Sequence, residues 1–229
     1  MTPLPPKTVI DRLETLHGRP ELSMARSPFE LIVWENVAYL ADDARRQKAF
    51  VLLRDSTGMT AQGIAAADDE TLMAVARHGI VPEQTVGKLR RIAEVAMSEF
   101  AGDVDAVVAL PTKEAMKALH TFPAIGKPAA EKILMMNGVL PVLALESNGL
   151  RVLQRIGYAL DTGNYDRDYR AMRAVTAGIS EDCEWLSMAH LLLRRHGQSV
   201  CRRSTPECGR CPLVDGCAYF SATDGTAGS

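Results

Sequence analysis

The sequence predicts an all-helical globular protein. Nearly half of its 229 residues are apolar (47%), whereas only 5% are aromatic. Alanine, leucine, arginine and glutamate, which favour helices, are plentiful, and the alternation of apolar and polar residues that is typical of strands is rare. The length allows one large domain or two small ones with proper cores.

The N-terminal stretch and the hydropathy pattern predict an intracellular protein. Residues 1–17 combine proline punctuation with an amphipathic segment and lack the apolar core of a secretion signal. No apolar run approaches the length that spans a bilayer, so we expect no membrane partner.

Helix start and stop signals divide most of the chain into helices. Ser27 can cap a helix, Pro28 suits its first position and Glu30 completes a capping box, which predicts a helix to about residue 41. Pro82 opens a long helix with one apolar face that ends at Gly102. The other expected helices cover 68–79, 113–120 with Thr112 as its cap, 128–138, 148–158, and two segments between 165 and 196.

Charge gives no general sign of nucleic-acid binding, because the net charge is −2. Basic residues nevertheless gather in two places, and either cluster by itself is typical of a solvated surface. They are Lys88, Arg90 and Arg91 in the middle of the chain, and Arg194, Arg195, Arg202, Arg203 and Arg210 around the cysteines.

Four of the five cysteines form a C-x6-C-x2-C-x5-C pattern near the C-terminus. Intracellular thiols stay reduced, so this pattern indicates a soft-metal site rather than a disulfide framework. Zinc usually takes paired C-x2-C knuckles, whereas the single compact loop here suits a four-cornered iron–sulfur cubane. The candidate ligands are Cys201, Cys208, Cys211 and Cys217.

The loop spacing, with His196-Gly197 before it and Cys211-Pro212-Leu213 inside it, resembles a known family. It is similar to the [4Fe–4S] loop of the endonuclease III branch of the helix–hairpin–helix DNA glycosylases. The resemblance implies a structural [4Fe–4S] cluster on the four cysteines and a loop that presents basic side chains to the DNA backbone. Those side chains are Arg202, Arg203 and Arg210.

A second motif, Phe-Pro-Ala-Ile-Gly at 122–126, resembles the Leu-Pro-Gly-Val-Gly centre of the family's helix–hairpin–helix. A tight turn at a helix N-terminus presents N–H groups and a positive dipole end to a phosphate, which positions DNA without reading its sequence. Gly126 is expected to supply the left-handed backbone of the turn, and Ala124 replaces the first glycine. The resemblance therefore assigns Ile125, Gly126 and Lys127 to DNA binding.

The position of the family's lysine nucleophile is occupied by proline. Bifunctional members carry that lysine two residues after the last glycine of the hairpin, which here is Pro128. Lys127 is one residue early and would point about 100° away on a helix. Schiff-base chemistry and strand cleavage are therefore not expected.

The segment 145–152 aligns with the stretch that holds the family's catalytic aspartate, since Arg151 and Val152 match. This alignment puts Glu146 in the aspartate's place. A carboxylate there can stabilise an oxocarbenium-like sugar or orient a water, although glutamate is one methylene longer. Because glutamate is a poor N-cap, Ser147 or the next residue is expected to cap the helix.

The helix from residue 28 can be laid without gaps on the family's first barrel helix. Glu35 then falls where adenine- and thymine-mismatch glycosylases carry a second acidic residue, and a carboxyl buried among apolar groups keeps its proton, as a general acid needs. The alternative, an ion-paired Glu35 among plain core residues, stays open. The base pocket, gap-filling and wedge candidates are Trp34, Tyr39, Leu40, Ile80 and Val81.

The resemblance covers about residues 28–220 and implies a two-lobed, all-α fold. A six-helix barrel would span 28–138, and 1–27 with 139–229 would form the lobe that carries the cluster. The expected protein is a monomeric, monofunctional DNA glycosylase that acts on lesions or mismatches in double-stranded DNA, cytoplasmic and nucleoid-associated if bacterial. The alternatives are a catalytically silent DNA-binding protein on the same scaffold and a zinc-bearing interaction module.

Overall fold

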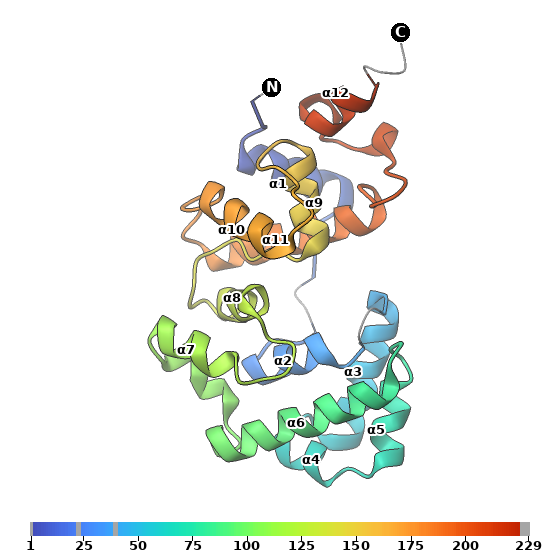
Figure 1. The fold of residues 1–229 in the computed structure, drawn as a ribbon, viewed down its shortest axis with the longest axis vertical. Helices are drawn as coiled ribbons and strands as arrows, with labels where there is room; N and C mark the ends of the chain where they lie inside the picture. Colours follow the sequence, from blue (N-terminus) through green and yellow to red (C-terminus); the bar gives the residue numbers. More distant parts are fainter. Residues whose placement is uncertain (1, 22–23, 39–40, 225–229) are drawn as a thin grey trace. The chain divides into compact units, whose positions relative to one another are not determined.

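The computed structural model describes residues 2–21, 24–38 and 41–224, and these ranges contain helices and loops but no strand (Figure 1). The predicted all-α class is therefore confirmed. By its internal contacts the chain divides into two compact units, Ser23–Val139 and Met1–Leu22 with Leu140–Ser229. Within the described ranges, no helix is long and apolar enough to cross a membrane.

The unit Ser23–Val139 is built around one long helix. This helix, α6, packs against α4 and α5 and also against α2, which in turn contacts η1, α8 and α3. Apolar side chains such as Leu89 and Ile92 of α6 are fully buried in these contacts. The elements are α2 (Pro28–Asn36), α3 (Asp43–Thr57), α4 (Ala61–Ala66), α5 (Asp69–Ala76), α6 (Pro82–Phe100), the 3₁₀ helix η1 (Val104–Ala109), α7 (Thr112–Leu119) and α8 (Lys127–Met136).

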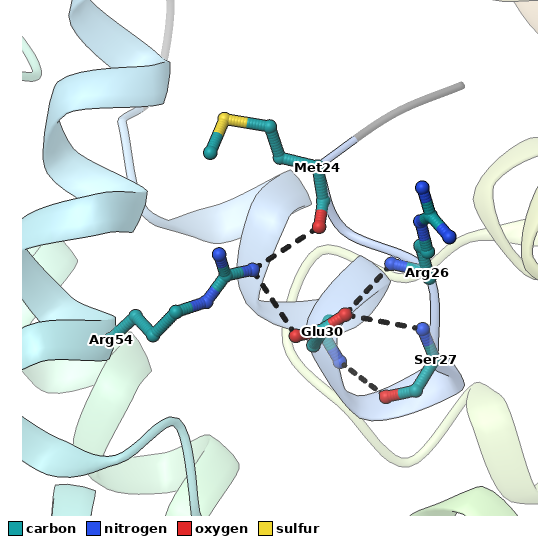
Figure 2. A network of polar contacts seen from close by, with 5 residues as sticks. All are labelled: Met24, Arg26, Ser27, Glu30 and Arg54. Carbon is teal, nitrogen blue, oxygen red and sulfur yellow. Dashed lines mark hydrogen bonds and ion pairs between the residues drawn. The ribbon is translucent and has the colours of Figure 1, made fainter. Parts of the chain in front are cut away.

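The start of α2 confirms the predicted capping box. The Ser27 hydroxyl accepts the Glu30 N–H at 3.3 Å, and the Glu30 carboxylate accepts the N–H groups of Arg26 and Ser27 (Figure 2). Arg54 of α3 pairs with the same carboxylate at 3.2 Å and donates to the Met24 carbonyl. The network fixes where α2 begins, and so the register of the residues that follow.

The second unit is dominated by the contact of α9 with α11, and α1 packs on the same α11. The cysteine loop follows α11 and is held by α1, because the Arg12 guanidinium donates to Asp215 at 2.6 Å and to the Pro212 carbonyl at 3.0 Å. The elements are α1 (Pro6–His17), α9 (Ser147–Arg155), α10 (Tyr165–Val175), α11 (Cys183–Ser199), the 3₁₀ helices η2 (Cys208–Arg210) and η3 (Val214–Gly216), and α12 (Ala218–Asp224).

Three local expectations differ from the structure. The helix that begins at Pro28 ends at Asn36 rather than near residue 41, because Asp42 caps a new helix by accepting the Arg45 N–H at 2.8 Å. That helix, α3, and the short α4 were not predicted. Thr112 is the first residue of α7, and Pro111 takes the cap position without a side-chain hydrogen bond.

Candidate functional site

The hairpin turn between α7 and α8 is hydrogen-bonded to a side chain of α2. The fully buried Asn36 amide donates to the Pro123 carbonyl and to the Ile32 carbonyl, both at 2.9 Å. Phe122 stacks on Phe100 of α6 with ring centroids 5.4 Å apart. Sequence analysis did not single out Asn36, although an amide inside an otherwise apolar helix is a signal that a buried polar group needs a partner.

The left-handed residue of this turn is Ala124, with φ +58°, and not Gly126, with φ −82° and ψ −178°. The prediction for Gly126 was therefore wrong. A bond from the Ile125 N–H to the Phe122 carbonyl (3.3 Å) closes a four-residue turn with Pro123 second and Ala124 third. Positive φ at the third position is the requirement that glycine usually meets in such turns.

Ala124→Gly is expected to stabilise the protein by about 0.5–1 kcal/mol. An L-residue in the left-handed region costs roughly 1–2 kcal/mol, and the greater chain entropy of glycine offsets part of the gain. Urea denaturation monitored by circular dichroism measures the change. The matched control is Ala74→Gly on the exposed face of α5, which should destabilise by up to about 1 kcal/mol. An equal loss of stability in both variants would contradict the inference that the backbone at Ala124 is strained.

Gly126 is the N-cap of α8, has an extended conformation and offers no side-chain hydrogen bond to the helix. As in any helix, the first N–H groups of α8 have no acceptor within the helix. Pro128 occupies the first turn and offers neither an amine nor an N–H. The Lys127 side chain is exposed, and its Nζ lies 3.9 Å from the carboxylate of the buried Glu131. The Ile125 side chain is buried, so a ligand at this residue would contact mainly its backbone.

Glu146 is itself the N-cap of α9, which corrects the expectation that its neighbours take this role. Its Oε1 accepts the Gly149 N–H at 2.8 Å, and its Oε2 accepts the Asn148 amide, also at 2.8 Å. The side chain is half-buried at the positive end of the helix. The carboxylate is thus held by both oxygens.

A chain of hydrogen bonds joins Glu146 to the cysteine loop. Arg151 donates to the Asn148 side-chain oxygen at 2.9 Å, to the Gly197 carbonyl at 2.7 Å and to the Cys201 carbonyl at 3.1 Å. Burial lowers the pKa of Arg151 from its ordinary value. This half-buried guanidinium fixes the start of the loop relative to α9.

Two nitrogen-bearing side chains lie beside the cysteine sulfurs. The Arg155 guanidinium donates to Cys201 Sγ at 3.4 Å, and His196 Nε2 lies 3.4 Å from Cys211 Sγ. Burial raises the pKa of the Cys211 thiol to about 11, and repulsion from the other three cysteines acts in the same direction. His196 Nδ1 lies 3.1 Å from His17 Nε2. Burial lowers the pKa of His196 to about 4. In the described ranges, no three His, Cys, Asp or Glu side chains are arranged to hold a metal ion.

Two of the three predicted DNA-contacting arginines share one acidic partner. Arg202 and Arg210 both pair with Glu207, and these contacts, that of Arg210 first, hold the pKa of this carboxyl below its ordinary value. Arg203 lines a cavity of about 600 Å³ beside α9, together with Arg151, Arg155 and Tyr219. The loop is therefore less cationic than its arginine count indicates.

The candidates for the base pocket and the wedge lie in the unit Ser23–Val139. Trp34 is half-buried and packs edge-on against Phe50, with centroids 5.3 Å apart. Ile80 is 54% exposed between α5 and α6, whereas Val81 is half-buried at the start of α6. Tyr39 and Leu40 lie outside the described residues. Glu35 forms an ion pair with Lys132 of α8, which sequence analysis did not single out.

Taken together, the structure defines an all-helical protein with a helix–hairpin–helix, a carboxylate at a helix N-terminus and a four-cysteine loop. In a solved structure of a trapped endonuclease III–DNA covalent intermediate the same fold recurs, with a TM-score of 0.73 and 19% identity over 94% of this chain and 95% of the other. No family model matches the sequence.

Sequence relatives point the same way. Endonuclease III of Rickettsia prowazekii is 32% identical over 114 residues, and the chain spans about half the length of such Rickettsia relatives. Endonuclease III of Escherichia coli strain K12 is 22% identical over 209 residues, which cover 91% of both chains. Fold and sequence together support a helix–hairpin–helix DNA glycosylase of the endonuclease III branch.

Proposed function

We propose that this protein is a monofunctional DNA glycosylase of base-excision repair, which flips a damaged or mismatched base out of double-stranded DNA and hydrolyses its N-glycosidic bond. The observation that carries the proposal is Glu146. Its half-buried carboxylate is fixed by two hydrogen bonds at the N-terminus of α9 and lies in the segment that resembles the family's catalytic stretch.

DNA would be held mainly through its phosphates. The hairpin supplies N–H groups at the start of α8, where the helix dipole favours an anion, and the exposed Lys127 adds charge beside them. Among the loop arginines, Arg203 is the strongest candidate, because the other two pair with Glu207. Such contacts position the duplex and leave base choice to the pocket.

The proposed chemistry needs only a carboxylate and a water. Glu146 would stabilise positive charge on the sugar as the base departs and then orient the attacking water. Because Pro128 has no amine, no Schiff base forms at this position and strand cleavage is not expected. Ile80, exposed at the start of the α6 segment, is the wedge candidate that would fill the space left by the flipped base, with Trp34 lining the pocket.

The four cysteines would hold a [4Fe–4S] cluster. The donor set fits this group, since four cysteine sulfurs lie close enough to repel one another as thiolates, the Arg155 guanidinium donates to one of them, and His196 Nε2 lies 3.4 Å from another. When bound, the cluster cross-links the loop and has no step in base release. It would thereby keep Arg151 and α9 in place.

Cys211→Ser is expected to remove the brown colour and most of the iron from anaerobically purified protein. The native protein should contain about four iron atoms per chain and little zinc by mass spectrometry of the metals. Cys183→Ser, at the first position of α11 and outside the loop, is the matched control and should keep both iron and colour. A colourless native protein with one zinc would overturn the cluster.

A panel of duplexes tests the activity. It contains uracil, thymine mismatches, oxidised guanine opposite adenine, alkylated bases and oxidised pyrimidines, and alkali reveals abasic sites. Release of at least one base without spontaneous strand cleavage is the expected result. Tight binding with no release across the panel would favour a silent DNA-binding protein, and efficient borohydride trapping would overturn the monofunctional assignment.

A further inference from the structure

The proposed function does not yet use the ion pair between Lys132 and Glu35. Lys132 Nζ contacts Glu35 Oε1, and the two side chains are only 11% and 23% exposed. The carboxylate comes from α2 and the amine from α8, two helices that pack directly on each other. The contact lies wholly within the unit Ser23–Val139.

Lys132 lies on nearly the same face of α8 as Pro128. It follows Pro128 by four residues, so the two lie about 40° apart around the helix and about 6 Å apart along it. The amine is therefore one turn beyond the position that carries a lysine in bifunctional relatives, and it points into the α2 contact. On α2, Asn36, which supports the hairpin, is adjacent to Glu35.

The pair has a clear electrostatic consequence. A carboxyl removed from water tends to keep its proton, whereas an ammonium in contact with it favours the ionised form. Removing one partner of such a pair leaves the other charge without compensation in a poorly hydrated place. Lys132 therefore acts against the general-acid role that the sequence position of Glu35 indicates.

Several other charged side chains on α2 and on the elements packed against it contact groups other than Glu35. Arg46 lies over Trp34, Arg54 pairs with Glu30, Asp105 accepts the Phe29 N–H, Arg90 and Arg91 pair with Asp69 and Glu94, and Glu131 faces Lys127. Lys132 is a cation in direct contact with the Glu35 carboxylate.

We infer that Lys132 is a positioning residue that holds Glu35 as an ionised carboxylate. The inference rests on the proposed function for its catalytic meaning. Glu35 then accepts hydrogen bonds from the flipped base, or stabilises positive charge on it, and does not protonate it. The substrate class that follows is bases that already carry positive charge in the ring, such as purines alkylated on a ring nitrogen, rather than neutral purines that need a proton to leave.

Carbon-13 NMR of the glutamate carboxyls tests the charge directly, with Glu35→Gln to assign the signal. At pH 7 the native signal should be that of an ionised carboxylate. Lys132→Met should shift it toward the protonated form, and Lys132→Arg should restore it. Lys48→Met, an exposed lysine of α3, is the control and should leave it unchanged. A protonated Glu35 in the native protein, or no shift in Lys132→Met, would overturn the inference.

Single-turnover excision of 7-methylguanine and 3-methyladenine measures the consequence. The native rate should change less than threefold between pH 6 and 8.5, whereas the Lys132→Met rate should rise more than tenfold over this range as Glu35 ionises. A purely structural role would lower the rate equally at every pH. If the native protein releases no base, the proposed function fails. The NMR result then still shows whether Lys132 keeps Glu35 ionised. Release of mismatched adenine in preference to the alkylated purines would overturn the substrate class.

Discussion

Glu146→Gln is expected to lower the single-turnover rate of base release by about 10²–10⁴-fold, the usual contribution of a positioned carboxylate. Glutamine keeps an oxygen that can accept the Gly149 N–H at 2.8 Å but loses the negative charge that would face the developing sugar cation. The measurement uses whichever lesion the panel identifies, with DNA affinity followed by fluorescence anisotropy, which should change little.

The matched control is Asp182→Asn at the N-cap of α11. This residue is exposed and caps its helix by accepting the Glu184 N–H at 2.8 Å, so the substitution removes a capping charge from the same unit and should leave excision unchanged. Equal rates of base release for the native protein and Glu146→Gln would show that Glu146 only caps α9 and has no catalytic role. Glu146→Asp then tests the extra methylene, since aspartate is the better cap and the family's residue.

Gly197→Ala is expected to destabilise the protein by about 2–3 kcal/mol, at the upper end of ordinary overpacking costs. A Cβ at Gly197 would lie 2.6 Å from the Asn148 carbonyl oxygen and 2.8 Å from Asn148 Cβ, so α11 and α9 would have to separate. Because Asn148 donates to Glu146 and accepts from Arg151, the shift would also disturb the proposed catalytic carboxylate.

Thermal and urea denaturation measure the loss of stability, and base release measures the disturbance of Glu146. Gly87→Ala in the exposed middle of α6 is the control, because a Cβ there meets nothing within 4 Å and should raise helix stability by up to about 1 kcal/mol. A Gly197→Ala protein as stable and active as the native one would contradict the close approach of the two helices.

Local signals predicted most of the helices and one of their caps. The capping box at Ser27 and Glu30 and the proline starts at Pro28 and Pro82 act within a single helical turn, so the chemistry that sets them is visible in the sequence. The helix α3 escaped prediction although Asp42 caps it, because its many charged residues leave a weak apolar pattern.

Residues at the candidate site were harder to assign. Gly126 was expected to take the left-handed position because glycine does so most readily, yet the turn places Ala124 there. Glu146 was expected to leave capping to its neighbours, yet it accepts the Gly149 N–H itself. In both cases a residue's average preference was overruled by the path that the surrounding chain imposes.

By itself the sequence determined the helical class, the spacing of the four cysteines and the absence of an amine at Pro128, because each depends on residue type and short spacing alone. Only the tertiary structure decided that Lys132 meets Glu35, that Asn36 supports Pro123, and that Arg151 joins Glu146 to the cysteine loop through Asn148. Most of these contacts join residues about 50 to 100 positions apart, and they form when helix packing, rather than local preference, brings the side chains together.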